Sequence, residues 1–298
     1  MPLNVAVFGL GSMGHGMASS ILRAGHTTWG VDVVAERVEA FVAEGGAPGA
    51  VHDAAPDLDA VVVVVLNAKQ TEAVLFGENG IAPRLRKGAV ILSCATMAPE
   101  IARYLASSAA ALGLHYLDAP ISGGAAKSAA GRLSVMASGS AEAFTAARPV
   151  LEATAETVFE MGHEPGAGSA MKAVNQMLAG VHIAAMAEAV TFGMTQGIPP
   201  ARFLEVISQC AGTSWMLENR APHVVDGDYT PRSAVDIWLK DLGIVLDIAK
   251  GARFGAPLTA AALQQYLAAS GSGLGGEDDA AVAKVYARNA GLTLPSED

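Results

Sequence analysis

A lysine and an amide stand one helical turn apart near the start of the longest helical pattern in the chain. The pattern continues to about Gln196 without a proline, and most of its residues are apolar, as in a helix that is buried on most sides. Lys172, Asn175, Ala179 and His182 share one face of this helix. The positive end of the helix macrodipole disfavours a charged lysine there, which lowers the pKa of its amine and makes a general base more accessible. Alternatively, Lys172 only extends along the helix and keeps its ammonium in water.

A second candidate for chemistry is the tripeptide Ser122-Gly123-Gly124. A hydroxyl group followed by two glycines presents one side-chain donor and unobstructed backbone N–H groups, which together suit the binding of a carboxylate. The same tripeptide is also common in ordinary turns, so this reading stays open beside the first.

The elements that must position these residues begin with a glycine-rich segment. A strand-like run at residues 3–8 is followed by Gly9, Leu10, Gly11, Ser12, Met13 and Gly14, and a helical pattern then covers residues 13–24. This context is typical of a dinucleotide-binding fingerprint. Gly9 allows a tight turn, Gly11 lets the backbone approach a pyrophosphate, and Gly14 lets the helix pack closely on the strand. The N-terminus of the helix supplies amide donors for the phosphates.

The next expected strand, residues 27–31, ends at Asp32, which follows Gly14 by 32 − 14 = 18 positions. A carboxylate at this place accepts hydrogen bonds from the ribose diol and repels a 2′-phosphate, so the sequence predicts NAD as the cofactor. Arg37 could accommodate that phosphate, which leaves the strictness of NAD over NADP open. The alternative for Asp32 is the N-cap of the following helix.

Strands and helices continue to alternate. Strands are expected at residues 60–66, 89–93, 114–117, 132–137 and 156–160, with helices at 70–76, 99–112 and 141–153. Ligands of a doubly wound sheet bind beyond the carboxyl ends of its strands, so Leu66, Asn67 and Thr96 are candidate cofactor contacts. Thr96 could also be the N-cap of the helix at 99–112.

Beyond Met161 the strand pattern ends and helical patterns follow. The sequence therefore predicts an α/β Rossmann-type dinucleotide-binding domain at residues 1–163 and an all-α domain at residues 164–298, which binds substrate and joins subunits.

Composition limits the kind of partner. With 29 acidic and 19 basic residues, the net charge of −10 argues against a nucleic-acid groove or an anionic membrane surface. No purely apolar run approaches the ~20 residues of a membrane span, and no export signal is visible at the N-terminus. Cys94 and Cys210 are too few for a disulfide framework or a metal cluster. We expect a soluble cytoplasmic protein without a metal, whose alanine-rich helical half forms a homodimer or homotetramer.

The glycine segment 9–14, the segment 118–133 around Ser122 and the segment 166–176 around Lys172 occur in this order along the chain. Together they resemble the β-hydroxyacid dehydrogenase family, which includes 3-hydroxyisobutyrate and tartronate semialdehyde dehydrogenases. The resemblance covers essentially the whole chain. It implies an NAD-dependent oxidoreductase that acts on a small hydroxy acid.

The resemblance also implies roles for single residues. Lys172 would be the catalytic acid/base, and Ser122, Gly123 and Gly124 would hold the substrate carboxylate. Asn175 would orient the substrate, and Lys240 would lie beside the nicotinamide. For Lys240 the alternative is an ion pair with Asp236, one turn earlier on a helix.

Gln176 departs from the family pattern, which usually has asparagine there, and this argues against the hydroxyisobutyrate branch. Segments of the second half (175–182, 214–220 and 233–243) are more similar to members that oxidise the C2 hydroxyl of a four-carbon sugar acid. Gln176 is therefore a further candidate for binding a substrate hydroxyl. The alternatives are tartronate semialdehyde or 3-hydroxyisobutyrate as substrate. Outside this family, an imine-reducing enzyme would be expected to lack Lys172, and a non-catalytic NAD-binding sensor remains the rival that is not an enzyme.

Overall fold

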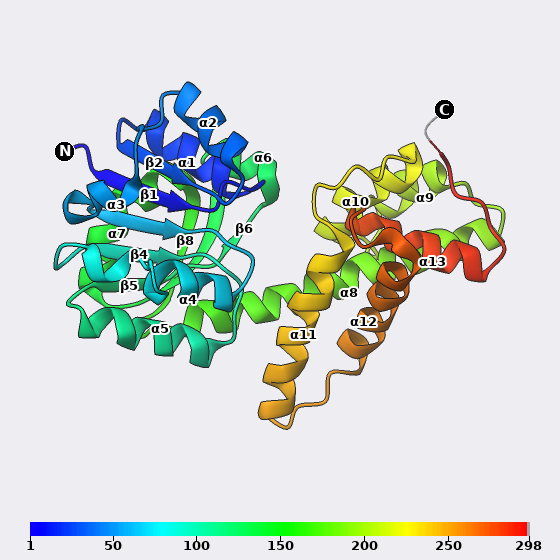
Figure 1. Ribbon diagram of the computed structural model, residues 1–298. Helices are drawn as coiled ribbons and strands as arrows, with labels where there is room; N and C mark the ends of the chain where they lie inside the picture. The colour runs from blue at the N-terminus through cyan, green and yellow to red at the C-terminus, as the bar shows by residue number, and fades with distance from the viewer. Residues whose placement is uncertain (297–298) are drawn as a thin grey trace. The chain divides into compact units, whose positions relative to one another are not determined.

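A computed structural model describes residues 1–296 of the chain. The chain forms two compact units, Met1–Lys172 and a second one that begins at Ala173. Figure 1 shows strands flanked by helices in the first unit and a group of helices in the second. This is the predicted architecture, an α/β dinucleotide-binding fold followed by a helical domain, and it is confirmed.

The first unit is organised around one sheet of eight strands in the order β2-β1-β3-β4-β5-β7-β6, with β8 also paired to β7. Strands β1 to β5 run parallel, β7 is antiparallel to β5 and β6, and β8 is parallel to β7. The strands are β1 (Asn4–Phe8), β2 (Thr27–Val31), β3 (Ala60–Val63), β4 (Val90–Ser93), β5 (His115–Asp118), β6 (Ile121–Ser122), β7 (Leu133–Ser138) and β8 (Ala155–Gly162).

Helices cover both faces of this sheet. They are α1 (Gly14–Arg23), α2 (Ala35–Ala43), α3 (Val51–Ala54), α4 (Ala68–Phe76), α5 (Pro99–Ala111), α6 (Gly124–Ala129) and α7 (Ala141–Thr154), with short 3-10 turns at Ala55–Asp57 (η1) and Ala82–Arg84 (η2). The buried strands are mostly apolar because alternate residues of a strand enter two different cores. Val5 and Val62 pack with α1 and α7, whereas Ala6 and Val61 pack with α4 and α5.

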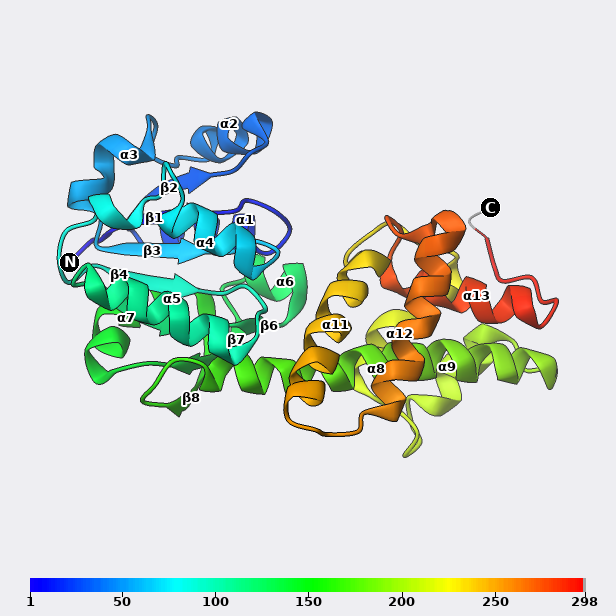
Figure 2. The ribbon, with the colours of Figure 1, turned by 60° about the horizontal axis from the view of Figure 1, so that its bottom comes forward.

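The elements of the second unit, as far as residue 296, are helices joined by short loops and one isolated bridge between Ala234 and Asp278. They are the greater part of α8 (Ala167–Thr195), then α9 (Pro200–Ile207), α10 (Trp215–Asp226), α11 (Val235–Gly251), α12 (Pro257–Ala269), the π turn η3 (Ser270–Leu274), η4 (Asp279–Ala281) and α13 (Val282–Asn289). Helices α11 and α12 lie side by side in both views (Figures 1 and 2).

Helix α8 is long and apolar enough, by composition alone, to cross a membrane, with a mean hydropathy of 1.4 over its most apolar window. Half of that window is buried inside the protein. Ile183, Met186 and Val190 of α8 belong to the core of the helical unit, together with Trp238 and Tyr266. This helix therefore forms the core of its domain, a role that accounts for its apolar composition.

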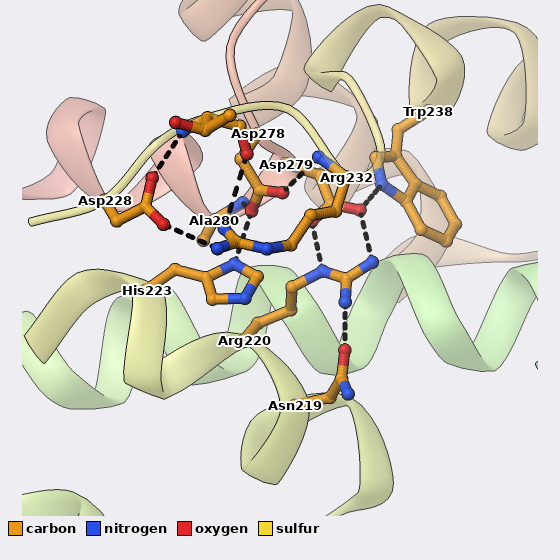
Figure 3. A network of polar contacts seen from close by, with 10 residues as sticks. Asn219, Arg220, His223, Asp228, Arg232, Trp238, Asp278, Asp279 and Ala280 are labelled. Carbon is orange, nitrogen blue, oxygen red and sulfur yellow. Dashed lines mark hydrogen bonds and ion pairs between the residues drawn. The ribbon is translucent and has the colours of Figure 1, made fainter. Parts of the chain in front are cut away.

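A buried polar network joins α10, α11 and η4 within the helical unit (Figure 3). Asp279 is fully buried and accepts hydrogen bonds from Nε of Arg220 at 2.5 Å and from Nε1 of Trp238 at 2.9 Å. The neighbouring Asp278 lies 2.8 Å from Nδ1 of His223 and accepts from the Arg232 backbone N–H at 3.0 Å. Arg220 also contacts Asn219. Because buried carboxylates are costly without donors, these contacts fix how the three elements pack.

Candidate active site

At two of the three glycines of this segment, the surrounding backbone leaves no room for a side chain. Gly9 has φ +96°, and a Cβ there would lie 2.3 Å from the Val64 carbonyl oxygen. A Cβ on Gly14 would lie 1.8 Å from the carbonyl oxygen of Gly9. A Cβ on Gly11, in contrast, would meet no described atom within 4 Å. The space at Gly11 is thus open for a ligand to approach the backbone, as a pyrophosphate requires.

Asp32 follows β2 and is connected directly to the glycine segment. Its Oδ2 accepts from the Leu10 N–H at 2.6 Å, and its Oδ1 accepts from the Val34 N–H at 2.9 Å. Burial raises the pKa of this carboxyl, but the hydrogen bonds from Val34 and Leu10 and the nearby Arg37 outweigh it, so that the pKa is lowered and Asp32 is ionised. Because the N-cap residue of α2 is Val34, the N-cap alternative for Asp32 is wrong.

The predicted contacts at the ends of β3 and β4 have local roles of their own. Strand β3 ends at Val63, earlier than expected, and leaves Leu66 exposed in the loop that follows. Asn67 is the N-cap of α4, and its Oδ1 accepts from the Gln70 N–H at 2.9 Å. Thr96 is not the N-cap of α5, a position occupied by Ala98. The cofactor contacts of Leu66, Asn67 and Thr96 stay predictions.

Ser122, Gly123 and Gly124 connect strand β6 to helix α6. Ser122 pairs with Ser134 of β7, so the position of its backbone is fixed by the sheet. Gly123 has φ +133° and Gly124 has φ +76°, conformations that side chains rarely permit. A Cβ on Gly124 would meet no described atom within 4 Å, whereas one on Gly123 would lie 3.0 Å from the Lys127 side chain. Glycines with positive φ also occur in ordinary turns, so the carboxylate site and the turn both stay predictions.

Lys172 is brought to this segment from the first turns of α8. The residue is only 8% exposed, and its Nζ donates to the carbonyl oxygen of Ile121 at 2.8 Å. The alternative in which Lys172 keeps its ammonium in water is therefore wrong. An amine held beside the strand that carries Ser122 can exchange a proton with a small molecule bound there.

Asn175, Gln176 and Lys240 are connected to one another in the second unit. Nδ2 of Asn175 donates to Oε1 of Gln176 at 2.9 Å, and Nε2 of Gln176 donates to Oδ2 of Asp241 at 2.5 Å. Nζ of Lys240 lies 2.7 Å from the other oxygen of Asp241, so Lys240 forms an ion pair with the adjacent residue. The pair with Asp236, given as an alternative from the sequence, stays a prediction. Asp241 is buried at the centre of this network.

The sequence interpretation missed two acids, Asp118 and Asp241. Asp118 stands at the carboxyl end of β5, as Asp32 stands after β2, and this position was the available signal. Asp241 follows Lys240 directly, and a buried acid beside a lysine gives no distinctive pattern. Among residues 1–296, no group of three or more His, Cys, Asp and Glu side chains could hold a metal ion.

Comparison with known protein families divides the chain into two matching regions. Residues 4–162 match the NAD binding domain of 6-phosphogluconate dehydrogenase. Residues 166–286 match the NAD-binding domain of NADP-dependent 3-hydroxyisobutyrate dehydrogenase. These matches confirm the prediction that the cofactor is NAD. The predicted domain boundary between residues 163 and 164 stays a prediction.

Individual relatives extend over the whole chain. An L-threonate dehydrogenase from Cupriavidus necator is 48% identical and covers 100% of this chain and 99% of its own length. Another from Escherichia coli K12 is 49% identical and covers 98% and 96%. A crystal structure of a 3-hydroxyisobutyrate dehydrogenase from Salmonella typhimurium superposes with a TM-score of 0.90 at 48% identity, covering 95% and 99%.

The order of the motifs, the strand–helix plan and these full-length relatives agree. The chain belongs to the β-hydroxyacid dehydrogenase family of NAD-dependent oxidoreductases, the family that includes 3-hydroxyisobutyrate dehydrogenases.

Proposed function

We propose that this protein uses NAD to oxidise the C2 hydroxyl group of a four-carbon sugar acid, L-threonate, to the 2-oxo acid. The observation that carries the chemistry is the buried Lys172, whose Nζ lies 2.8 Å from the carbonyl oxygen of the residue before Ser122. Full-length relatives named L-threonate dehydrogenase, at 48% and 49% identity, support the substrate. Gln176, which stands where hydroxyisobutyrate enzymes usually have asparagine, supports it as well.

The first unit would hold the nucleotide. Its pyrophosphate would lie against the backbone of the segment formed by Gly9, Leu10, Gly11, Ser12, Met13 and Gly14, where the open space at Gly11 fits a close approach. Asp32 would accept hydrogen bonds from the ribose diol. Leu66, Asn67, Thr96 and Lys240 are proposed as further cofactor contacts. When bound, NAD supplies an acceptor for a hydride ion.

The substrate carboxylate would be bound by the Ser122 hydroxyl and the backbone N–H groups of Gly123 and Gly124. We propose substrate-binding roles for Asn175 and Gln176 as well. Each hydroxyl of a polyhydroxylated acid needs a hydrogen-bond partner once it is removed from water, and side-chain amides provide both donors and acceptors.

Lys172 is proposed as the catalytic acid/base. Its neutral amine would take the proton of the C2 hydroxyl while the hydrogen on the same carbon leaves with its electron pair for the nicotinamide, so that a carbonyl forms. In the reverse direction the ammonium returns that proton. The Ile121 carbonyl oxygen, which accepts a hydrogen bond from Nζ, would fix the position of the amine.

A substrate panel tests the proposal. The formation of NADH, followed by its absorbance, would be measured with L-threonate, D-threonate, D-erythronate, D-glycerate and 3-hydroxyisobutyrate, with NADP in parallel reactions. Selective oxidation of L-threonate with NAD is the expected result. Selective turnover of 3-hydroxyisobutyrate, the substrate named for the Salmonella structure, would retain the mechanism and replace the substrate. Absence of any turnover while NAD still binds would favour the non-catalytic sensor.

We also propose that the protein is cytoplasmic and forms a homodimer or homotetramer through its helical domain. Val174, Leu178 and Phe192 of α8 are large apolar side chains that stay exposed in the single chain. Such exposure favours a second copy as a covering surface. Light scattering coupled to gel filtration would give the number of subunits.

A further inference from the structure

Asp118 accepts four hydrogen bonds, three from the start of α8 and one from Ser138 of β7. Its Oδ2 accepts from the Gly166 N–H at 2.9 Å, from the Ser169 N–H at 2.8 Å and from the Ser138 hydroxyl at 3.3 Å. Its Oδ1 accepts from the Ser169 hydroxyl at 2.7 Å. The acid is only 1% exposed, so these donors replace the water that a carboxylate otherwise requires.

The arrangement satisfies backbone N–H groups that a helix start leaves without partners. Besides those of Gly166 and Ser169, the N–H of Gly168 donates to the Ser138 hydroxyl at 3.0 Å, so Ser138 relays the contact to Asp118. A negative charge at this end of a helix is also favoured by the macrodipole. Burial raises the pKa of Asp118 even though Ser169, Gly166 and Ser138 all favour its ionised form.

Close packing supports the same anchoring. A Cβ on Gly168 would lie 2.3 Å from the Met136 carbonyl oxygen and 2.8 Å from that of Asp118. The first turn of α8 is thus pressed against the ends of β5 and β7, and a displacement there would move the rest of the helix start.

Lys172 follows Ser169 by three residues and therefore lies one turn further along the same face of α8. Ser169 is bonded to Asp118 through both its backbone and its hydroxyl group, so the carboxylate fixes the turn from which the lysine side chain extends. Nζ of Lys172 must reach the Ile121 oxygen from that turn.

We infer that Asp118 is the positioning residue for Lys172, acting through Ser169 and the start of α8. The inference rests on the proposed acid/base role of Lys172. A displacement of a catalytic group by about 1 Å can lower turnover by about 100-fold. Asp118→Asn removes the negative charge and replaces one of the two acceptor oxygens by an amide donor, which weakens the contacts to Gly166 and Ser169 and would displace the helix start in this way.

A double-mutant cycle tests the inference in the full-length enzyme. We expect Asp118→Asn to lower kcat by about 10- to 100-fold and to leave the Kd for NAD unchanged. In a Lys172→Ala background, Asp118→Asn should lower kcat by at most about a further twofold. The amine that Asp118 positions is already missing from that variant. An equal loss in both backgrounds would overturn the inference, since damage to the fold reduces activity whichever residue stands at position 172.

Milder variants keep the test usable if Asp118→Asn does not fold. Ser169→Ala removes one hydroxyl contact to Asp118 and should lower kcat by about tenfold, again only when Lys172 is present. Thr154→Val is the matched control, because its buried hydroxyl donates to Val150 of α7 at 2.8 Å and belongs to the same unit. That control should keep its kcat. A loss in Thr154→Val equal to that in Ser169→Ala would overturn the inference.

Failure of the proposed function is recognised separately. If Lys172→Ala alone retains full activity, Lys172 is not the acid/base, whatever Asp118 does. If Lys172→Ala loses activity while Asp118→Asn and Ser169→Ala keep theirs, the proposed function holds and the positioning role is wrong.

Discussion

Nζ of Lys172 donates a hydrogen bond to the backbone oxygen of Ile121, the residue immediately before Ser122. Lys172 comes from the start of a helix and Ser122 from a two-residue strand, so two segments distant in sequence converge at one end of the sheet. An amine placed beside the backbone that we propose to bind a carboxylate is an arrangement that the oxidation of a hydroxy acid can use.

Replacement of Lys172 by alanine should lower kcat by about 100- to 10,000-fold, because general acid–base catalysis contributes that much. The Kd for NAD should stay unchanged. Steady-state oxidation of the best substrate and titration with NAD measure the two effects. Lys87→Ala, at an exposed lysine of the same unit, is the control and should behave as the parent enzyme. Full activity of Lys172→Ala would remove the lysine from the mechanism.

Two glycines of the nucleotide-binding segment should respond differently to alanine. Gly14→Ala forces a Cβ to within 1.8 Å of the Gly9 carbonyl oxygen and should destabilise the fold, by about 1–3 kcal/mol as in other overpacked sites. Gly11→Ala meets no described atom within 4 Å, so the melting temperature should be retained while NAD binding is lost. Calorimetric melting and NAD titration would be compared for both variants. Unchanged NAD affinity in Gly11→Ala would contradict the placement of the pyrophosphate.

Asp32→Asn should weaken NAD binding by about 10- to 100-fold, the worth of a hydrogen bond to a charged group. The affinity for NADP should fall less, or rise, because the charge that repels a 2′-phosphate is gone and Arg37 is released from the carboxylate, from which it now lies 3.4 Å away. Binding of both nucleotides would be titrated at one salt concentration. An unchanged ratio of the two affinities would show that Asp32 does not select the cofactor.

Loss of Arg220 should destabilise the helical unit severely. Asp279 is fully buried, and Arg220→Ala leaves its charge without its main partner, at a cost of about 3–5 kcal/mol. Arg202→Ala is the matched control, because it breaks the exposed Arg202–Glu205 pair at 2.7 Å, which is worth no more than about 1 kcal/mol. Urea unfolding followed by circular dichroism would compare the two, and similar shifts of the midpoint would contradict the assignment.

Asp278 should make stability depend on pH. Burial raises the pKa of its carboxyl, but hydrogen bonds from His223, Arg232 and Ala280 outweigh that effect and lower the pKa. Its stabilising contribution is therefore complete above the unfolded pKa of about 3.9 and is lost as the pH falls through the lower folded pKa. The destabilisation caused by Asp278→Asn should be large at about pH 7 and smaller at about pH 3. Urea unfolding at both pH values measures it, and a destabilisation of equal size at the two would contradict the prediction.

Much of the fold could be predicted from local sequence. The sequence predicts both ends of β1, β2, β4 and β5 to within about one residue. Short apolar runs that turn residues or acids interrupt are typical of buried strands and too short for most helices. Strand β3 was expected to reach Leu66 but ends at Val63, since an apolar run does not show where the ladder of hydrogen bonds stops.

Side-chain partners could be predicted less well than elements. Thr96 and Asp32 were both plausible helix caps, and neither is one, because α5 and α2 begin after other residues. Asn67 does cap a helix, a role that its position after a strand did not indicate. Asp118 and Asp241 were missed because their partners are distant in sequence, and only the folded chain brings donors such as Ser169 and Gln176 to them.

The hydrogen bond from the Leu10 N–H to Asp32 has a consequence for the evolution of cofactor preference. The carboxylate that we propose to select the ribose also shapes the loop that we propose to receive the phosphates. A change of preference toward NADP that began at Asp32 would remove the acceptor of Leu10 in the same step. Such a change would need a second substitution that restores the loop, so we expect switched enzymes to differ at a coupled pair of positions.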